Sequence, residues 1–260
     1  MYKIILVVVS LFILGFSCTS PIQYVQNGRQ ALNDWDYVQQ HLVIKEQTIV
    51  ETKEGSYDIE ITYPTITEPA KEGTEGFNRF IEFLLKNNFL PEFKVRVGEA
   101  GPLLVADVPY SLSGSYEILE SKLDYISVRL FFTEYLGGAH PVSWTYTIDY
   151  ELDVRHLVDL GDIFNVKEDV YLPRLSELSQ PLLVSQLDDM ADLQWIEKGT
   201  KPVKSNFKNF NVTAEGLKFV FDPYQVAPYA AGMQEITIFY NQLEDLINKN
   251  GPVKYVRTAN

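Results

Sequence analysis

The stretch SYDIEITY, residues 56–63, alternates strictly between apolar and polar side chains. A period of two places alternate side chains on opposite faces of a β-strand, so this stretch predicts a strand with one buried face. That face consists of Tyr57, Ile59, Ile61 and Tyr63. Pro64 follows directly and cannot donate to a strand ladder, so we expect the strand to end there.

The same period recurs along much of the chain. Strand patterns cover residues 41–45, 47–52, 110–113, 115–120, 125–132, 142–152, 207–212, 217–221 and 235–240. Successive strands without an intervening helix predict antiparallel pairing.

Three segments have helical spacing instead. In the first, over residues 74–88, an apolar stripe is formed by Phe77, Phe80, Ile81, Leu84 and Leu85. Thr74 is the expected N-cap, and Asn87-Asn88 before Pro91 the expected end. A second helix is expected over 167–187 with Leu175, Leu178, Leu182 and Leu183 inward, and a short third over 241–248. The predicted fold is α+β, an antiparallel sheet covered by two or three helices in two intimately packed halves.

The N-terminus predicts export and lipid attachment. Lys3 precedes an apolar run that ends just before Cys18, the only cysteine of the chain. This layout is typical of a bacterial lipoprotein precursor, whose cysteine is lipidated. An ordinary signal peptide or an uncleaved anchor, with Cys18 incidental, remains the alternative. The expected organisation is a signal peptide (1–17), an anchor and tether (18–40), two halves (41–153 and 154–250) and a tail (251–260).

Composition narrows the class of protein. Apolar residues make up 46 % of the chain, which is typical of a folded domain with a core, and the formal charge is −13. Such a negative charge disfavours binding to nucleic acid and attracts a cationic partner. The alternative is that acidity only keeps an envelope protein soluble.

Two segments stand apart from the strand and helix patterns. They are GGAHP, residues 137–141, and FDPYQVAPYAAG, residues 221–232. With the strands that flank them, they closely resemble a bacterial envelope domain. That domain forms the extracytoplasmic part of the lysozyme-sensing anti-sigma factor and accompanies a peptidoglycan deacetylase. The resemblance covers nearly all of the chain after the tether.

The resemblance implies a receptor that grips lysozyme. Only three residues precede the apolar segment, and no deacetylase barrel is recognised after about residue 250. We therefore expect the binding module to stand alone on its lipid anchor. The expected partners are a cationic protein such as lysozyme, or peptidoglycan, together with a membrane through Cys18.

The candidate site residues each have a structural alternative. His140 is a base, a metal ligand, an interface contact, or a structural histidine bonded to a backbone carbonyl. Asp222 is a turn former or a general acid. Tyr224 and Tyr229, beside prolines, present flat rings to a partner or plug the end of the sheet. We predict no metal site, because the three histidines lack ligand spacing, and no cofactor.

These observations lead to three hypotheses. The first is a non-enzymatic, lipid-anchored envelope module, periplasmic or surface-facing, that binds or inhibits lysozyme-type muramidases or senses cell-wall material. The second is a cell-wall hydrolase or deacetylase-like enzyme that uses His140 and Asp222. The third is a structural envelope lipoprotein without a dedicated ligand.

Overall fold

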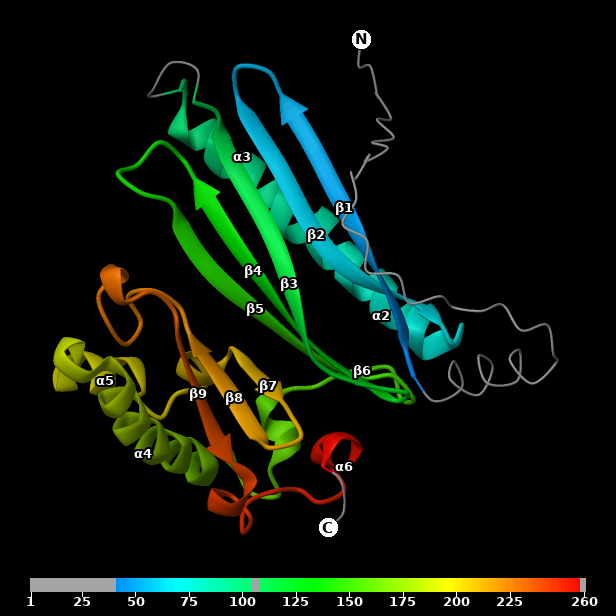
Figure 1. Ribbon diagram of the computed structural model, residues 1–260, viewed down its shortest axis with the longest axis vertical. Coiled ribbons are helices and arrows are strands. Elements are labelled where there is room, and N and C mark those ends of the chain that lie inside the picture. The colour runs from blue at the N-terminus through cyan, green and yellow to red at the C-terminus, as the bar shows by residue number, and fades with distance from the viewer. Residues whose placement is uncertain (1–40, 104–107, 258–260) are drawn as a thin grey trace, which may run out of the picture.

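The computed structural model describes residues 41–103 and 108–257. The predicted signal peptide, Cys18 and the tether therefore lie outside the described residues. The described part contains two β-sheets with helices packed against them (Figure 1). The larger has six strands in chain order: β1 (Val43–Lys53), β2 (Tyr57–Glu68), β3 (Tyr110–Lys122), β4 (Tyr125–Tyr135), β5 (Val142–Glu151) and β6 (His156–Leu157).

One strand pair of the larger sheet runs parallel. A helical crossover separates β2 from β3, and Tyr57 pairs with Tyr110 while Ile61 pairs with Gly114. The other neighbouring strands pair antiparallel across short connections. The α+β class is thus confirmed, and the parallel pair arises because a helix intervenes there.

The prediction that the strand over 56–63 ends at Pro64 is wrong. Strand β2 continues to Glu68, and Pro64 pairs with Glu46 of β1. Strand β3 pairs with β2 only as far as Ile61, so at the proline β2 has a partner strand on one side only. A missing N–H is tolerated at such a position.

A continuous helical rod forms the crossover, and its predicted end is also wrong. The rod comprises α2 (Glu72–Phe83), the π-helical turn η1 (Leu84–Phe89) and α3 (Leu90–Ala100). The π-helical turn shifts the backbone pairing, so that the Leu90 N–H bonds the Leu85 carbonyl five residues earlier. This wider turn accommodates Pro91, whose ring would clash with the carbonyl four residues earlier in an α-helix.

The start of the rod lies against the sheet. Gly73 leaves no room for a side chain, because the Leu152 carbonyl oxygen lies 1.7 Å from where a Cβ would stand. Thr74 is the third residue of the helix, not the predicted N-cap, and its hydroxyl accepts the Lys71 N–H at 3.0 Å.

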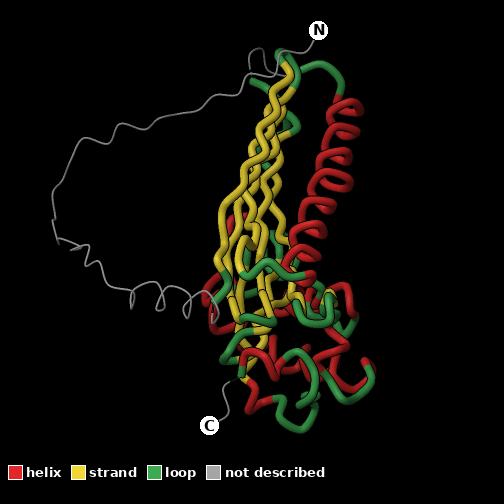
Figure 2. Tube along the Cα trace, turned by 90° about the vertical axis from the view of Figure 1, so that its right-hand side faces the viewer, coloured by secondary structure: helices red, strands yellow, loops and turns green. Residues whose placement is uncertain are grey.

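The rod packs along one face of the larger sheet, as Figure 2 shows from the side. Apolar side chains of the predicted strand and helix faces form this first core. Its buried members include Ile59, Ile61, Phe77, Ile81, Leu85, Phe93, Leu112, Val128, Leu130, Phe132 and Ile148. The alternation predicted for 56–63 and the stripe predicted for 74–88 are confirmed by this packing.

A second core lies in the C-terminal part. Its regular elements are α4 (Glu168–Leu187), α5 (Leu193–Gly199), β7 (Phe210–Val212), β8 (Gly216–Phe221), β9 (Gln234–Phe239) and α6 (Val253–Val256). Short 3-10 turns connect them: η2 (Leu160–Ile163), η3 (Asp188–Met190), η4 (Lys204–Phe207), η5 (Tyr229–Ala231) and η6 (Tyr240–Gln242). Strands β7, β8 and β9 form an antiparallel sheet. The helix predicted over 167–187 is confirmed, with Leu175 and Leu183 fully buried.

The helix predicted over 241–248 is wrong. Only the 3-10 turn η6 forms there, and Ile247 makes a β-bridge with Phe164. The Asn248 N–H donates to the Ile163 carbonyl at 2.8 Å, and the Leu246 carbonyl accepts the Asn165 N–H at 2.8 Å, so this segment pairs with the chain around residues 163–165 beyond its own local turns. The 251–260 segment, expected to be a tail, contributes α6, whose Val253 and Val256 are buried in the second core.

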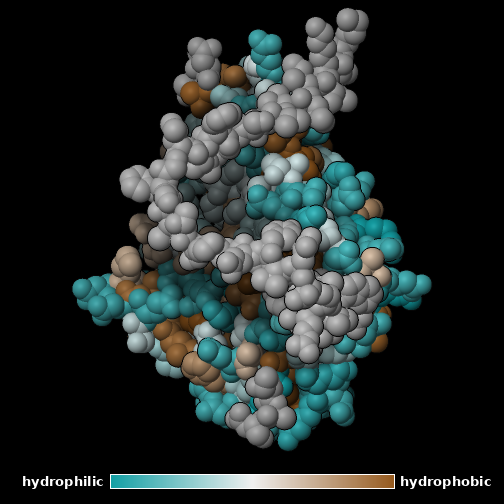
Figure 3. All heavy atoms as spheres, turned by 45° about the vertical axis from the view of Figure 1, so that its right-hand side comes forward, coloured by the Kyte–Doolittle hydropathy of each residue, from teal (hydrophilic) through white to brown (hydrophobic). Residues whose placement is uncertain are grey.

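The smaller sheet packs on the face of β4 and β5 opposite the rod. The Val212 N–H donates to Asp149 Oδ1 at 3.1 Å, and the Phe210 N–H donates to the Thr147 hydroxyl at 3.1 Å. In Figure 3 hydrophilic residues cover most of the described surface on the face shown, with smaller apolar patches between them.

Candidate functional site

Two loops far apart in sequence meet beside the smaller sheet. One joins β4 to β5 and carries His140; the other joins β8 to β9 and carries Tyr224 and Tyr229. The rings of His140 and Tyr229 stack with centroids 4.0 Å apart, and the Tyr224 and Tyr229 rings lie 5.6 Å apart. We call these three side chains the aromatic loop patch. His140 is exposed, Tyr229 half-buried, and Tyr224 53 % exposed.

The backbone of both loops is held in a particular shape. Gly137 adopts φ 78°, which glycine reaches without strain, and Tyr224 adopts φ 71°, a less common conformation for a residue with a side chain. The Trp195 indole N–H donates to the Tyr224 carbonyl at 2.9 Å, and the Gln225 amide donates to the Gly199 carbonyl at 3.2 Å. Contacts from α5 and the residues after it therefore fix the loop that carries the tyrosines.

Hydrogen bonds also fix the His140 ring. A carbonyl can only accept, so Nδ1–H donates to the Pro141 carbonyl at 2.9 Å. In the neutral ring Nε2 then accepts from the Tyr224 hydroxyl, at 3.4 Å. The Tyr229 hydroxyl donates to the same Pro141 carbonyl at 3.0 Å. A substrate that used the Nε2 lone pair as a base would have to displace Tyr224.

Asp222 lies apart from this patch in its contacts. Its Oδ1 accepts the Thr145 N–H at 2.8 Å, and its Oδ2 accepts the Asn209 side-chain amide at 3.1 Å. Burial raises the pKa of the Asp222 carboxyl, against the lowering effect of the hydrogen bonds from Thr145. Across residues 41–103 and 108–257, no hydrogen bond or ion pair joins Asp222 to His140. The carboxylate thus ties the end of β8 to β5.

Metal-ligating side chains do not gather in the part of the chain that the structure describes. No group of three or more histidine, cysteine, aspartate or glutamate residues is placed there to hold a metal ion. His156 lies at 2.9 Å from Asp162, on a different part of the fold from His140.

The sequence reasoning missed a polar cluster between the two sheets. Asp149 of β5 is fully buried, and its Oδ1 accepts the Tyr125 hydroxyl at 2.7 Å. Arg129 of β4 is 3 % exposed; its Nε–H donates to Asn211 Oδ1 at 3.2 Å, and it forms an ion pair with Glu235. We call Tyr125, Arg129, Asp149, Asn211 and Glu235 the polar joint.

Burial dominates the electrostatics of the polar joint. Complete burial raises the pKa of Asp149 to about 7, although the hydrogen bond from Tyr125 works in the opposite direction. The second Asp149 oxygen and Arg129 Nη2 have no hydrogen-bond partner among the described residues. The available signal was the alternation of β4 and β5, which places Arg129 and Asp149 on the face away from the apolar side chains.

Comparison with known proteins finds a family model that matches the region of the second loop. Residues 161–241 match the family described as Protein of unknown function (DUF3298). Residues 161–241 are thus similar to a DUF3298 domain. The matched region includes Asp222, Tyr224 and Tyr229, whereas His140 precedes it.

Curated relatives match part of the chain. Over 139 residues it is 31 % identical to the peptidoglycan-N-acetylmuramic acid deacetylase PdaC of Bacillus subtilis, covering 53 % of this chain and 29 % of PdaC. Over 144 residues it is 24 % identical to the immunogenic protein MPT64 of Mycobacterium tuberculosis, covering 54 % of this chain and 61 % of MPT64. The chain thus spans less than two thirds of either relative. The resemblance predicted from the loop motifs is confirmed for the DUF3298 domain and its deacetylase relative.

Solved DUF3298 structures share the fold. A family member from Pseudomonas aeruginosa superposes with a TM-score of 0.61 at 15 % identity, covering 84 % of this chain and 98 % of that one. A member from Bacteroides fragilis superposes with a TM-score of 0.56 at 18 % identity, covering 82 % of this chain and 96 % of that one.

In the described residues, no helix is both long and apolar enough to cross a bilayer.

Proposed function

We propose that this protein is a non-enzymatic binding module of the cell envelope. It is held there by a lipid at Cys18, and its aromatic loop patch captures a cationic protein of the lysozyme type. The observation that carries the proposal is the stacking of His140, Tyr224 and Tyr229 across two loops. Relationship to a protein named as a peptidoglycan deacetylase supports a place of action at the cell wall.

The patch has the properties of a protein-binding surface. Its rings rest on loops held by hydrogen bonds from Trp195 and Gln225, so little side-chain freedom is lost on binding. The faces of tyrosine rings attract lysine and arginine side chains. The formal charge of −13 accelerates the approach of a basic partner.

The enzyme hypothesis has less support from the geometry. A hydrolase that used His140 with Asp222 requires the two side chains to act on one substrate atom, yet the Asp222 oxygens bond to Thr145 and Asn209. Alanine at His140 and at Asp222 tests this alternative in an assay of cell-wall hydrolysis. Loss of turnover in folded variants would support the enzyme.

Titration of the protein with a cationic lysozyme at physiological salt tests the binding proposal. An equally basic unrelated protein, such as a cytochrome c, is the control for charge attraction. We expect saturable binding to lysozyme alone that survives added salt, because salt screens nonspecific attraction first. Equal binding of the two proteins would refute the proposal.

Two variants test whether lysozyme contacts the aromatic loop patch. The double substitution Tyr224→Ala with Tyr229→Ala should weaken lysozyme binding at least about tenfold, since it removes two aromatic anchors. Phe239→Ala removes another exposed aromatic ring, 48 % exposed at the end of β9, and should leave affinity within about twofold. Equal affinities for the two variants would exclude the aromatic loop patch as the contact.

A further inference from the structure

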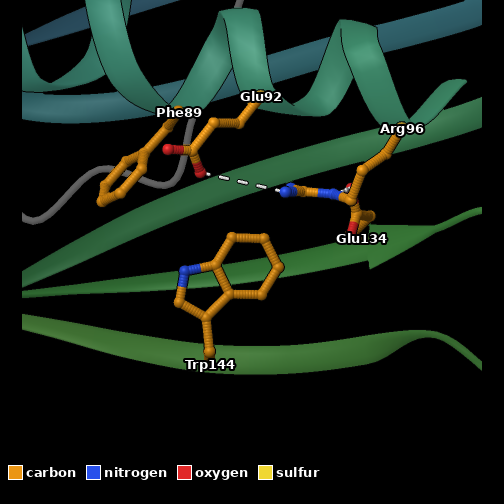
Figure 4. Close-up of a pocket in the computed structure, with 5 residues that line it drawn as sticks. All are labelled: Phe89, Glu92, Arg96, Glu134 and Trp144. Carbon is orange, nitrogen blue, oxygen red and sulfur yellow. Dashed lines mark hydrogen bonds and ion pairs between the residues drawn. The ribbon is translucent and has the colours of Figure 1, made fainter. Parts of the chain in front are cut away.

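A pocket lies between the helical rod and the larger sheet, on the face opposite the polar joint. Its lining residues are Phe89 at the end of η1, Glu92 and Arg96 of α3, Glu134 of β4 and Trp144 of β5. Figure 4 shows Phe89, Glu92 and Arg96 coming from the rod, with Trp144 on the strand below them. The volume is about 310 Å³, the lower end of the range for small-molecule sites.

The aromatic walls of the pocket are braced from behind. Phe132 is 1 % exposed, and its ring lies 5.4 Å from that of Trp144 and 4.8 Å from that of Phe89. The Phe89 ring also contacts that of Tyr146, at 5.4 Å. Trp144 and Phe89 themselves are only half-buried. Rings fixed in this way are ready to stack on a ligand without losing much freedom.

The π-helical turn positions one of the two walls. η1 ends at Phe89, and π-helical turns inside α-helices occur frequently at functional sites. The turn adds a residue relative to a regular α-helix, which rotates the side chains that follow it. Phe89 therefore lies at the end of the turn itself, and Glu92 and Arg96 reach the pocket from the helix whose register the turn has altered.

Charged groups form the other side of the pocket. Arg96 Nε–H donates to Glu134 Oε1 at 2.8 Å, and an Arg96 terminal nitrogen lies 3.8 Å from Glu92 Oε2. The Glu134 side chain is 10 % exposed and that of Glu92 63 %. The pocket thus presents N–H donors and carboxylate acceptors side by side next to apolar rings.

This combination selects one class of ligand. An anion would face two carboxylates and one guanidinium, and a cation would be repelled by Arg96, which lies between the carboxylates. A neutral sugar suits the pocket, because adjacent hydroxyls both donate and accept while the C–H face of the ring packs on an aromatic side chain. We propose that this pocket binds one pyranose ring of a neutral glycan.

Titration of the purified protein with two oligosaccharides tests the proposal. Tri-N-acetylchitotriose and cellotriose differ in the acetamido group, so they separate a need for that group from recognition of hydroxyls alone. We expect saturable binding of at least one of the two oligosaccharides. Calorimetry and saturation-transfer NMR measure this binding. Absence of saturation by both at tens of millimolar, roughly the limit of specific weak binding, overturns the proposal.

Two variants test whether the sugar binds in this pocket. Trp144→Ala should lower sugar affinity at least about tenfold, since it removes the main stacking surface. Phe83→Ala is the matched control, because Phe83 is an aromatic residue of the same rod, 58 % exposed and outside the pocket. The sugar affinity of the Phe83→Ala variant should stay within about twofold of that of the wild type. Equal effects of the two substitutions contradict the assignment.

The Glu92→Gln variant distinguishes a sugar-binding site from a site that binds amines. Glutamine keeps a hydrogen-bonding group, so sugar affinity should change by no more than about threefold. Capped lysine is the amine probe, and we expect it not to compete with the sugar. Competition by capped lysine that Glu92→Gln abolishes would identify a cation site and overturn the proposal. Sugar binding that persists in the Tyr224→Ala, Tyr229→Ala protein keeps this pocket distinct from the aromatic loop patch.

Discussion

The two faces of β5 show two different ways of joining layers. Ile148 faces the helical rod and is fully buried among apolar side chains. Its neighbour Asp149 faces the smaller sheet and is equally buried, but it is held by hydrogen bonds from Tyr125 and Val212. The layer between β5 and the helical rod is held by apolar packing. The layer between β5 and the smaller sheet contains buried polar groups, most of which have hydrogen-bond partners. We infer that the first is insensitive to pH and the second is not.

Removal of an apolar side chain should have the largest effect. Ile148→Ala deletes buried carbon and leaves a cavity in the first core, so we expect a loss of about 2–5 kcal/mol in the free energy of unfolding. This loss should be the same at pH 5 and pH 8, because no titratable group is removed. Urea unfolding at the two pH values measures it; a loss that differs between them by more than about 1 kcal/mol contradicts the contrast between the faces.

A neutral isostere on the other face should remove a pH dependence. The folded pKa of Asp149 is about 7, above the unfolded value near 4, so the folded state binds the proton more tightly. Its contribution to stability is fully present below the unfolded pKa and is lost as pH rises through about 7. Between pH 5 and pH 8 this loss amounts to roughly 2–3 kcal/mol.

Asp149→Asn keeps the acceptor for Tyr125 and Val212 but cannot ionise. The difference in unfolding free energy between this variant and the wild type should therefore shift in favour of the variant as pH rises from 5 to 8. Using the difference cancels every other titrating group that the two proteins share. A constant difference across this range would show that Asp149 is ionised in the folded state throughout, as it is in the unfolded chain, and would contradict the raised pKa.

Arg129→Ala tests the remainder of the polar joint. It leaves Asn211 Oδ1 buried without a donor, and we expect a loss of about 1–3 kcal/mol. Glu235 is 39 % exposed and keeps Lys218 at 3.0 Å, so no charge is stranded there. Arg129→Lys keeps the charge but removes the planar guanidinium. Its stability should equal that of the wild type if only the charge matters, and should fall as in Arg129→Ala if the guanidinium matters. Thermal unfolding of both variants distinguishes these cases.

Strand and helix patterns were readable because they depend on neighbours in sequence. The apolar face of β2 and the inward leucines of α4 follow from periods of 2 and 3.6 residues. Pro64 and Pro91 misled the prediction of element ends. Each is accommodated by its surroundings, the first by a side of β2 without a partner strand and the second by the π-helical turn η1.

The candidate site was readable in part for the same reason. Glycines and prolines in 137–141 and 221–232 mark both loops as unusual turns. That His140 stacks on Tyr229, while Asp222 bonds to Thr145 instead, depends on contacts across 80 or so residues. No local pattern specifies such a pairing.

By itself, the sequence determined most of the strands, the helices over 74–88 and 167–187, which of their faces are apolar, and that the chain is acidic. Those properties arise from local periodicity and from summed charge. Only the tertiary structure decided that a polar face of β5 is buried, that two distant loops share one patch, and that Trp144 and Glu134 line one pocket with α3. Those outcomes depend on which surfaces pack together, and packing places residues side by side irrespective of their distance along the chain.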